Sequence, residues 1–241
     1  MTFLALHGFT QRGSMWAEVA AAVGGEWVTP DLPGHGDEPA CGWREAVAGI
    51  GSRLAAIAAP RCLVGYSMGG RLAVAAALDH PGLVDRLVIV SAGPGLAAAE
   101  ERRRRRARDR ELAAHLEKVG MAAFAREWLE RPLFAGLQRR PAEWRETDLA
   151  TRAGNRAEGV AEALRRLGQG AQPSLGHRLG ELAMPVLLMA GKNDPKYLDL
   201  ARDMAARIPR VVLAEMPGAG HSVVGERPAE VAAALAAWLA E

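Results

Sequence analysis

The sequence predicts an α/β fold with a mostly parallel sheet and an inserted helical cap. Short apolar runs alternate with helical runs over most of the chain, which is typical of parallel strands joined by covering helices. The runs expected to form strands are Thr2–Leu6, Trp27–Thr29, Cys62–Gly65, Arg86–Ser91, Met184–Ala190 and Val211–Met216. From about residue 95 to residue 177 the alternation stops, and the sequence reads as helical and rich in arginine. We therefore expect an α/β core of residues 1–94 and 178–241, with residues 95–177 as a cap.

The runs between the expected strands have the spacing of helices. Trp16–Val23 carries apolar residues at helical intervals, and residues 43–58 read as a second helix. An alanine-rich run from residue 71 ends near the His80-Pro81-Gly82 turn, and a further helix is expected to end near Ala206. The closing helix, residues 228–239, begins with a proline, where a missing N–H costs nothing.

Composition and charge exclude several classes of protein. The chain has 241 residues, of which 49% are hydrophobic and 24% charged, as in an ordinary globular domain. A net charge of +2 gives no reason to expect nucleic acid as a partner. No apolar run approaches the roughly 20 residues of a membrane span, and we expect no signal peptide because a strand-like run without a basic region or cleavage site comes first. The two cysteines, Cys41 and Cys62, suit neither a disulfide framework nor a metal site, so we expect a reducing, cytoplasmic compartment.

The charges are distributed unevenly between cap and core. Residues 94–177 contain 17 basic and 12 acidic side chains, whereas the rest of the chain has 13 basic and 16 acidic ones. The small net charge therefore conceals a basic cap over a mildly acidic core. A cleft lined by charges of one sign attracts ions of the other sign. The arginine run Arg102–Arg106 by itself is interpreted mainly as a solvated helix face.

The stretch Gly65-Tyr66-Ser67-Met68-Gly69-Gly70 predicts a nucleophile elbow. It follows an expected strand and precedes an expected helix, and this context gives the common G-x-S-x-G pattern its meaning. The turn forces Ser67 into a strained conformation, and the flanking glycines let backbone pass closely. We expect the serine oxygen to stand above the sheet edge, at the N-terminus of the next helix.

A serine hydroxyl is a weak nucleophile or base at neutral pH and needs an adjacent base. His221 lies in a glycine loop after the last strand, and Asp194 follows the preceding strand. The order Ser67, Asp194, His221 is that of an α/β-hydrolase triad, and strand ends at one sheet edge would bring the three together. The alternative is a surface aspartate and a structural histidine. Asp199 and Asp203 fall inside the following helix and are weaker candidates.

An oxyanion hole needs two backbone N–H donors, and we expect them from Phe9 and Met68. Phe9 lies in the loop after the first strand, and Met68 follows the nucleophile. His7 and His35 also lie in glycine-flanked loops and are interpreted as loop-packing residues. No dinucleotide, phosphate or zinc motif is present, so we expect no cofactor and no metal.

Several motifs give the chain a family resemblance. His7–Phe9, Asp31–Gly36, Gly65–Gly70 and Gly220–His221 resemble the α/β-hydrolase superfamily. A second set of residues comprises Gly69–Arg71, Ser91–Leu96, Asp109–Arg110, Trp128, Pro132–Ala135, Arg152, Asn155, Gln172–Pro173 and Asp194–Tyr197. This second set is similar to the SHCHC (2-succinyl-6-hydroxy-2,4-cyclohexadiene-1-carboxylate) synthases of menaquinone biosynthesis. The resemblance covers most of the chain.

The resemblance implies a lyase that eliminates pyruvate from 2-succinyl-5-enolpyruvyl-6-hydroxy-3-cyclohexene-1-carboxylate. This substrate carries three carboxylates, and arginine is suited to binding carboxylates in a bidentate manner. The residues that match the family's substrate-binding positions are Tyr66, Arg71, Arg110, Trp128, Arg152 and Lys196. Ser67, activated by His221 and Asp194, would remove a proton α to the succinyl ketone, and the oxyanion hole would hold the enolate. The expected partner is thus a small polyanion.

Two departures from the family pattern and two alternatives remain. The family usually has extra strands before the His-Gly-Phe loop, so a sheet of about six strands is expected here. It often has a second histidine shortly after the catalytic one, where this chain reads Ser222-Val223-Val224-Gly225-Glu226.

A carboxylester or C–C-bond hydrolase of the same fold is the alternative enzyme. A ligand-binding homologue without catalysis is the alternative from another class, although the intact triad argues against it. The sequence does not indicate an oligomeric state.

Overall fold

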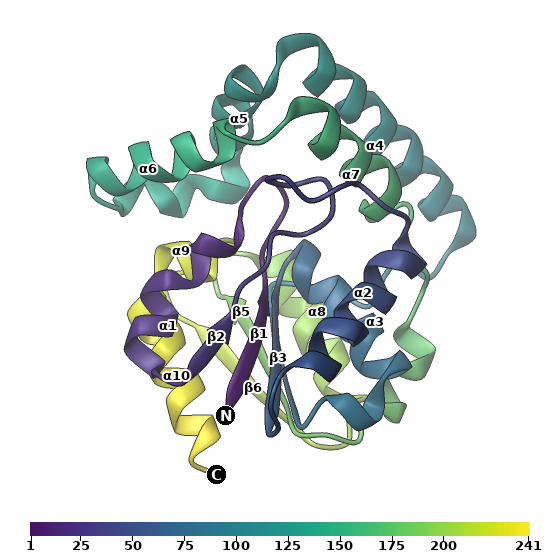
Figure 1. Cartoon of the computed structure of the whole chain (residues 1–241), viewed down its shortest axis with the longest axis vertical. Helices are drawn as coiled ribbons and strands as arrows, with labels where there is room; N and C mark the ends of the chain where they lie inside the picture. Colours follow the sequence, from purple (N-terminus) through teal and green to yellow (C-terminus); the bar gives the residue numbers. More distant parts are fainter.

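The computed structural model describes all 241 residues, and a six-stranded sheet forms its centre (Figure 1). The strands are β1 Thr2–Leu6, β2 Glu26–Val28, β3 Arg61–Tyr66, β4 Arg86–Val90, β5 Val186–Gly191 and β6 Val211–Met216. Their order is β2-β1-β3-β4-β5-β6, and every neighbouring pair is parallel. The predicted α/β fold with about six strands is confirmed. Since all strands run the same way, the loops that follow them meet at one edge.

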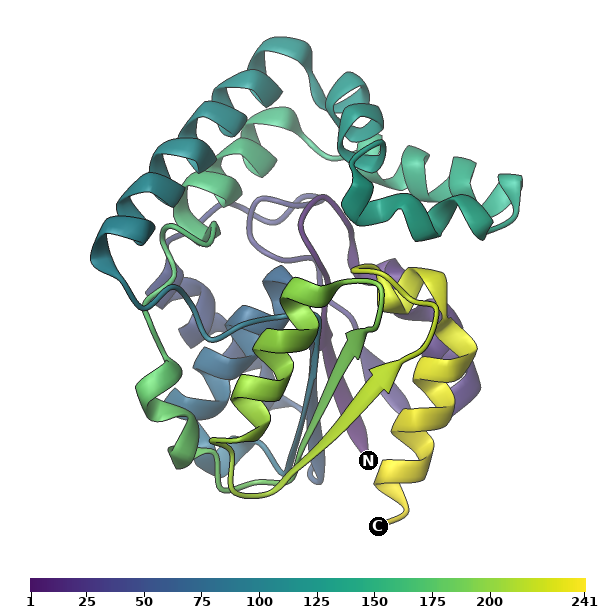
Figure 2. The same cartoon turned by 180° about the vertical axis from the view of Figure 1, so that it is seen from behind.

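Both faces of the sheet are covered because successive side chains of each strand point to opposite faces. Leu4, Leu63 and Leu87 pack with α2 (Trp43–Ala56) and α3 (Met68–Asp79). Phe3, Val64 and Val88 pack on the other face with α1 (Ala17–Val23) and α10 (Pro228–Leu239). The helix between β5 and β6 is α8 (Pro195–Ala205), and Figure 2 shows α8 and α10 on opposite sides of these strands. The strand ends at the carboxyl edge are therefore anchored in a sheet that is packed on both faces.

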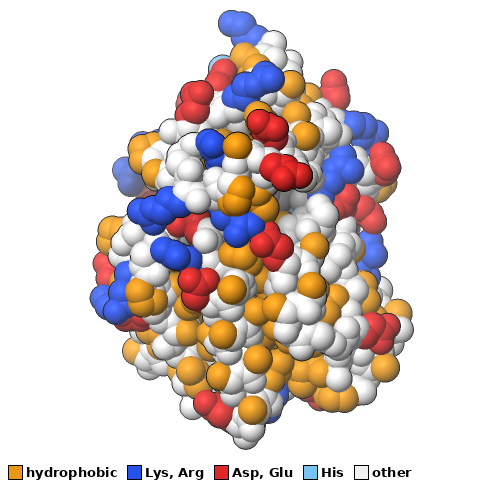
Figure 3. All heavy atoms as spheres, turned by 90° about the vertical axis from the view of Figure 1, so that its left-hand side faces the viewer, with side chains coloured by type: hydrophobic (Ala, Val, Ile, Leu, Met, Phe, Trp, Pro, Cys, Tyr) orange, Lys and Arg blue, Asp and Glu red, His pale blue; other side chains and the backbone are white.

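Four helices lie between β4 and β5 and extend over the carboxyl edge of the sheet (Figures 1 and 2). They are α4 Ala99–Val119, α5 Met121–Leu129, α6 Ala142–Ala153 and α7 Ala157–Leu167. They have a small apolar core of their own, centred on Leu116, Phe124 and Val160. Charged side chains gather over this upper part of the molecule in Figure 3. The cap and core boundaries expected from the sequence remain a prediction, with which this arrangement agrees.

The structure adds details that the sequence did not predict. A short helix, α9 (Val223–Glu226), follows the loop that carries His221. Short 3-10 turns occur at Gly13–Trp16, Pro81–Leu83, Pro132–Arg139 and Gly176–Glu181. None of the helices combines the length and the apolar character that a membrane crossing requires.

Candidate active site

Ser67 lies in a strained turn between β3 and α3. Its φ of 50° and ψ of −106° fall in a region that non-glycine residues rarely adopt. The turn closes because backbone approaches its glycines closely. A Cβ atom on Gly65 would lie 2.5 Å from the carbonyl oxygen of Gly69, and one on Gly69 would lie 2.3 Å from that of Leu6. Only glycine fits at these two positions, so the local sequence dictates the elbow.

A continuous hydrogen-bonded set joins Ser67, His221 and Asp194. Ser67 Oγ lies 3.1 Å from His221 Nε2, and His221 Nδ1 lies 2.8 Å from Asp194 Oδ2. The three residues follow β3, β6 and β5, so the parallel sheet brings their loops to one edge. Asp194 is 6% exposed and His221 is 3% exposed, so the pair interacts with little competition from water. The structure thus brings together the three residues that the sequence order singled out.

Aromatic rings surround the imidazole of His221. The ring centroid of Tyr197 lies 4.4 Å from that of His221, and those of Tyr66 and Phe134 lie 5.6 Å and 6.3 Å away. These rings restrict the orientations of the histidine and exclude solvent from it. Asp194 also caps α8, since its Oδ1 accepts the backbone N–H of Tyr197 at 3.3 Å. The carboxylate is therefore fixed from both sides.

Two backbone N–H groups near Ser67 are available to an oxygen atom of a ligand. The N–H of Phe9 donates to no group of the protein. Met68 is the first residue of α3, where a backbone N–H has no acceptor within the helix. Phe9 and Met68 both line the cavity over Ser67. Their placement agrees with the expected oxyanion hole.

His7 and His35 hold the loop that carries Phe9. His7 Nε2 accepts the N–H of Leu32 at 2.8 Å, and His35 Nε2 accepts the N–H of Thr10 at 3.1 Å. Burial lowers the pKa of His7 to about 4 and that of His35 to about 3, so both rings are neutral at physiological pH. Their packing role agrees with the sequence interpretation.

A cavity of about 230 Å³ opens over Ser67, between the sheet edge and the cap. Its cationic lining residues are Arg71, Arg105, Arg131, Arg152 and Lys196. Its aromatic lining residues are Phe9, Tyr66, Trp128, Phe134 and Tyr197. No aspartate or glutamate lines it. The cavity is therefore suited to a small molecule with several negative charges and an apolar framework.

Two of these arginines are buried and anchored. Arg71 is 7% exposed and donates to the carbonyl oxygen of Leu167 at 2.8 Å, with no carboxylate partner. Its burial lowers its pKa to about 10, which leaves the guanidinium charged at neutral pH. Arg152 is 1% exposed, and its Nε donates to Asp148 at 2.8 Å. Its Nη1 donates to Thr10 at 2.5 Å, whereas its Nη2 is buried without a partner. A ligand carboxylate would satisfy that nitrogen.

Arg110 does not lie in this cavity, contrary to the sequence expectation. It is exposed and absent from the lining, where Arg105 of the same helix is found instead. The neighbouring Asp109 is buried and pairs with Arg105 at 2.7 Å, so Arg110, one position further around α4, faces solvent. Arg131 is a second lining residue that the sequence reading missed. The ion-pair spacing of Arg105 and Asp109 was a signal that could have identified the former.

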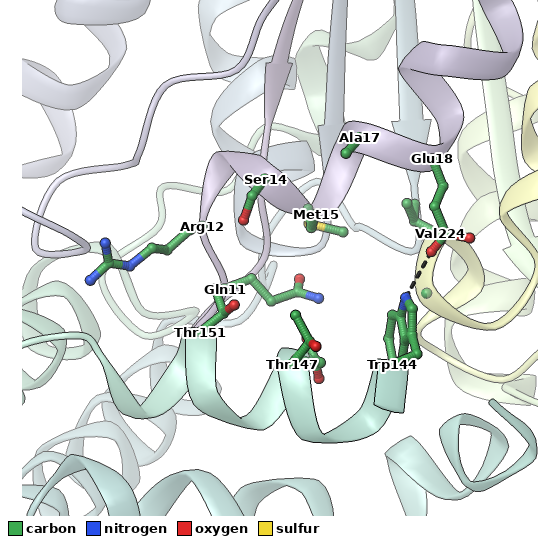
Figure 4. A pocket seen from close by; sticks show the side chains of 12 residues that line it. Gln11, Arg12, Ser14, Met15, Ala17, Glu18, Trp144, Thr147, Thr151 and Val224 are labelled. Carbon is green, nitrogen blue, oxygen red and sulfur yellow. Dashed lines mark hydrogen bonds between the residues drawn. The ribbon is translucent and has the colours of Figure 1, made fainter. Parts of the chain in front are cut away.

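A larger cleft of about 290 Å³ lies beside this cavity, between α1 and α6. In Figure 4, Trp144 of α6 reaches across it and donates to Glu18 of α1 at 2.7 Å. Gln11 lines both spaces, but Ser67 lines only the smaller one. The larger cleft thus lacks Ser67, His221 and Asp194 in its lining.

Comparisons with known proteins agree with this geometry. A model of the alpha/beta hydrolase family matches residues 3–234. The 2-succinyl-6-hydroxy-2,4-cyclohexadiene-1-carboxylate synthase of Serratia proteamaculans is 33% identical over 241 residues, covering 97% of this chain and 91% of its own. The chain belongs to the SHCHC synthase family of alpha/beta hydrolases. A Bacillus subtilis protein provisionally given the same name is 36% identical over 231 residues, which are 92% of this chain and 84% of its own.

Solved structures share the fold over the whole chain. MenH from S. aureus matches with a TM-score of 0.94 at 27% identity, covering 100% of this chain and 93% of that one. A thermophilic esterase from Thermogutta terrifontis, solved with malate bound, matches with a TM-score of 0.84 at 25% identity. It covers 100% of this chain and 89% of the esterase. The fold alone is therefore shared with hydrolases, and the side chains of the cavity must distinguish the chemistry.

Proposed function

We propose that this chain is a carbon–oxygen lyase of menaquinone biosynthesis. It eliminates pyruvate from 2-succinyl-5-enolpyruvyl-6-hydroxy-3-cyclohexene-1-carboxylate and leaves 2-succinyl-6-hydroxy-2,4-cyclohexadiene-1-carboxylate. The observation that carries the proposal is the cavity over Ser67, which has five cationic side chains and no carboxylate in its lining. A substrate with three carboxylates matches that lining, whereas a neutral ester does not need it. The names of relatives at 33% identity support the same reaction.

The first step is removal of the proton α to the succinyl ketone. Ser67 takes this proton while its own hydroxyl proton passes to His221, which lies 3.1 Å away. Asp194 stabilises the imidazolium that forms and keeps Nδ1 protonated. The electrons of the broken C–H bond move onto the ketone oxygen. The N–H groups of Phe9 and Met68 stabilise this enolate oxygen.

The second step is departure of the enolpyruvyl group. The enolate collapses to the ketone, and its electrons pass through the ring and break the C–O bond to the leaving group. The enolate of pyruvate accepts a proton, which His221 can supply, and tautomerises to pyruvate. No acyl-enzyme forms, so the serine acts in proton transfer alone.

The arginines determine how the substrate binds. Arg71 and Arg152 present buried guanidinium groups to the cavity from α3 and α6. Arg105, Arg131 and Lys196 add charge at its cap side and near the N-terminus of α8. Tyr66 and Trp128 supply apolar surface for the ring of the substrate. Several fixed charges around one serine select a polyanion over a neutral acyl compound.

The deciding experiment supplies the purified protein with the enolpyruvyl substrate. Release of pyruvate, followed by a coupled dehydrogenase, should equal formation of the cyclohexadiene chromophore in amount and in rate. Pyruvate without the chromophore, or neither product, would refute the proposal. Ser67→Ala is the matched inactive control, because it removes only the reacting oxygen.

An ester or C–C-bond hydrolase on the same fold is the alternative. It is favoured by the elbow geometry and free N–H groups, which equally suit a tetrahedral acyl intermediate. A chromogenic ester distinguishes the two functions. Burst release of the chromophore, with turnover comparable to that on the enolpyruvyl substrate, would favour the hydrolase.

A further inference from the structure

The hydroxyl of Tyr197 ends a chain of hydrogen bonds that begins in the cap. Arg105 of α4 donates from Nη1 to Oε1 of Gln169. Gln169 in turn donates from Nε2 to the Tyr197 hydroxyl at 2.7 Å. The ring of Tyr197 packs on the imidazole of His221, with the centroids 4.4 Å apart. A cavity arginine is thus connected to the histidine of the triad through two side chains.

Both ends of this chain are held by buried carboxylates. Asp109, which is 3% exposed, accepts Arg105 Nε at 2.7 Å with one oxygen and the N–H of Gly170 at 3.0 Å with the other. One carboxylate therefore orients both the arginine and the loop that carries Gln169. At the other end, Asp194 accepts the N–H of Tyr197 and the imidazole of His221. Gln169 is the side chain that joins the two anchored ends.

The hydroxyl of Tyr197 is not needed to fill space against His221. A phenylalanine ring would make the same contact, and a buried hydroxyl is costly unless it forms a hydrogen bond. Tyr197 is 7% exposed, and burial raises the pKa of its phenol, so the group stays neutral. Its bond to Gln169 gives the hydroxyl a partner from the cap side of the cavity. The hydroxyl therefore orients the ring of Tyr197 and is not needed for its packing.

We propose that Tyr197 is a positioning residue for His221 and that Gln169 couples it to Arg105. A carboxylate bound at Arg105 adds a second anionic partner to the guanidinium that Asp109 already orients, and this added restraint passes through Gln169 and the Tyr197 hydroxyl to the imidazole. The histidine then spends more time in the orientation that Ser67 needs. The inference rests on the proposed function, since a polyanionic substrate is what occupies Arg105. A ligand without an anionic group at Arg105 does not orient His221 in this way.

The test is a double-mutant cycle between Arg105 and Tyr197. Tyr197→Phe keeps the ring, so kcat for pyruvate release should fall about three- to tenfold while KM changes less than about twofold. Arg105→Gln should raise KM and lower kcat, because it removes a binding charge and the start of the chain. The double variant should lose no more kcat than Arg105→Gln alone. Gln169→Leu should reproduce the kcat loss of Tyr197→Phe.

Arg108 provides the matched control, because it is an exposed arginine on the same helix. Arg108→Gln should leave wild-type kinetics, and its combination with Tyr197→Phe should show only the loss due to Tyr197→Phe. Wild-type kcat in Tyr197→Phe, or simple multiplication of the losses in the Arg105 and Tyr197 double variant, would overturn the coupling. Thermal melting of each variant excludes a general loss of folding.

A second readout does not depend on turnover. The downfield NMR resonance of the His221 Nδ1 proton should broaden or shift in Tyr197→Phe and in Gln169→Leu, but not in Arg108→Gln. An identical resonance in all of these proteins contradicts the inference even if the wild type is active. Conversely, a wild type that releases no pyruvate refutes the proposed function, and the resonance still tests the coupling.

Discussion

One carboxylate, that of Asp194, accepts His221 Nδ1 at 2.8 Å and the backbone N–H of Tyr197 at 3.3 Å. The start of α8 and the orientation of the imidazole are thereby set by the same side chain. The distance between Ser67 and His221 depends on that orientation, so under the proposed mechanism the reactivity of the serine depends on where α8 begins. Any change in this helix cap is then also a change in the chemistry of the site.

Asp194→Asn should separate these two roles. The amide oxygen can still cap α8, but the amide cannot stabilise an imidazolium and favours the wrong histidine tautomer. We expect kcat to fall on the order of 10³- to 10⁴-fold, as for loss of the aspartate in a triad. The melting temperature should change little, whereas Asp194→Ala should lower it because the cap is lost. Steady-state kinetics and thermal unfolding of both variants test this.

Ser67→Ala should abolish pyruvate release without abolishing substrate binding. The methyl group cannot take a proton, while the arginines proposed to bind the carboxylates are untouched. Calorimetric titration with the substrate should give a dissociation constant within about tenfold of the wild-type KM, provided that chemistry is slow relative to dissociation. Retained turnover in this variant would contradict a role for Ser67 in proton transfer.

Arg152→Gln and Arg110→Gln should behave differently. Arg152 is buried, lines the cavity and has an Nη2 without a partner, whereas Arg110 is exposed and outside the cavity. We expect Arg152→Gln to raise KM by roughly 100-fold or more, which corresponds to about 3 kcal/mol for a lost buried charge pair. KM for Arg110→Gln should stay within about twofold of the wild type. Equal effects of the two substitutions would mean that the cap binds substrate in a different arrangement.

Acid should destabilise the protein through His7 and His35. Burial holds the pKa of His7 at about 4 and that of His35 at about 3, below the value of 6.5 for a free histidine. Below pH 6.5 the unfolded chain therefore binds protons that the folded protein does not. The free energy of unfolding should fall as pH drops from about 6.5 towards 4 for His7 and towards 3 for His35. Each of the two histidines accounts for a loss of a few kcal/mol, at about 1.4 kcal/mol per unit of pKa difference.

Urea unfolding between pH 4 and 7 measures this loss. In His35→Gln the dependence on pH should be shallower than in the wild type, since one buried group no longer titrates. His115 lies at the surface of the cap, so His115→Gln should leave the dependence unchanged. A slope that is the same in all three proteins would exclude the buried histidines as its cause.

The sheet and the grouping of Ser67, His221 and Asp194 could be predicted from the sequence because local sequence patterns determine both. Ser67, Asp194 and His221 lie shortly after three strand-like runs. Parallel strands bring the residues that follow them together whatever the details of packing. The lining of the cap was less accessible. Five consecutive arginines, Arg102–Arg106, occupy every side of a helix, so the sequence does not tell which one faces the cavity. Packing of α4 on α7 decides which residue of the run faces the cavity, and that residue is Arg105. Arg110, which the family resemblance had indicated, lies outside the cavity.

The insertion between β4 and β5 has a consequence for biosynthesis on the ribosome. Ser67 and His221 are 154 positions apart, and the cap is translated between them. The elbow emerges with β1 to β4, but β5 and β6 can add to the sheet only after the cap has been synthesised. A nascent chain therefore carries Ser67 without His221 beside it, and the proposed triad is complete only when the last strand and its loop have docked. Under the proposed function, activity therefore depends on folding of the carboxyl end and not of the elbow alone.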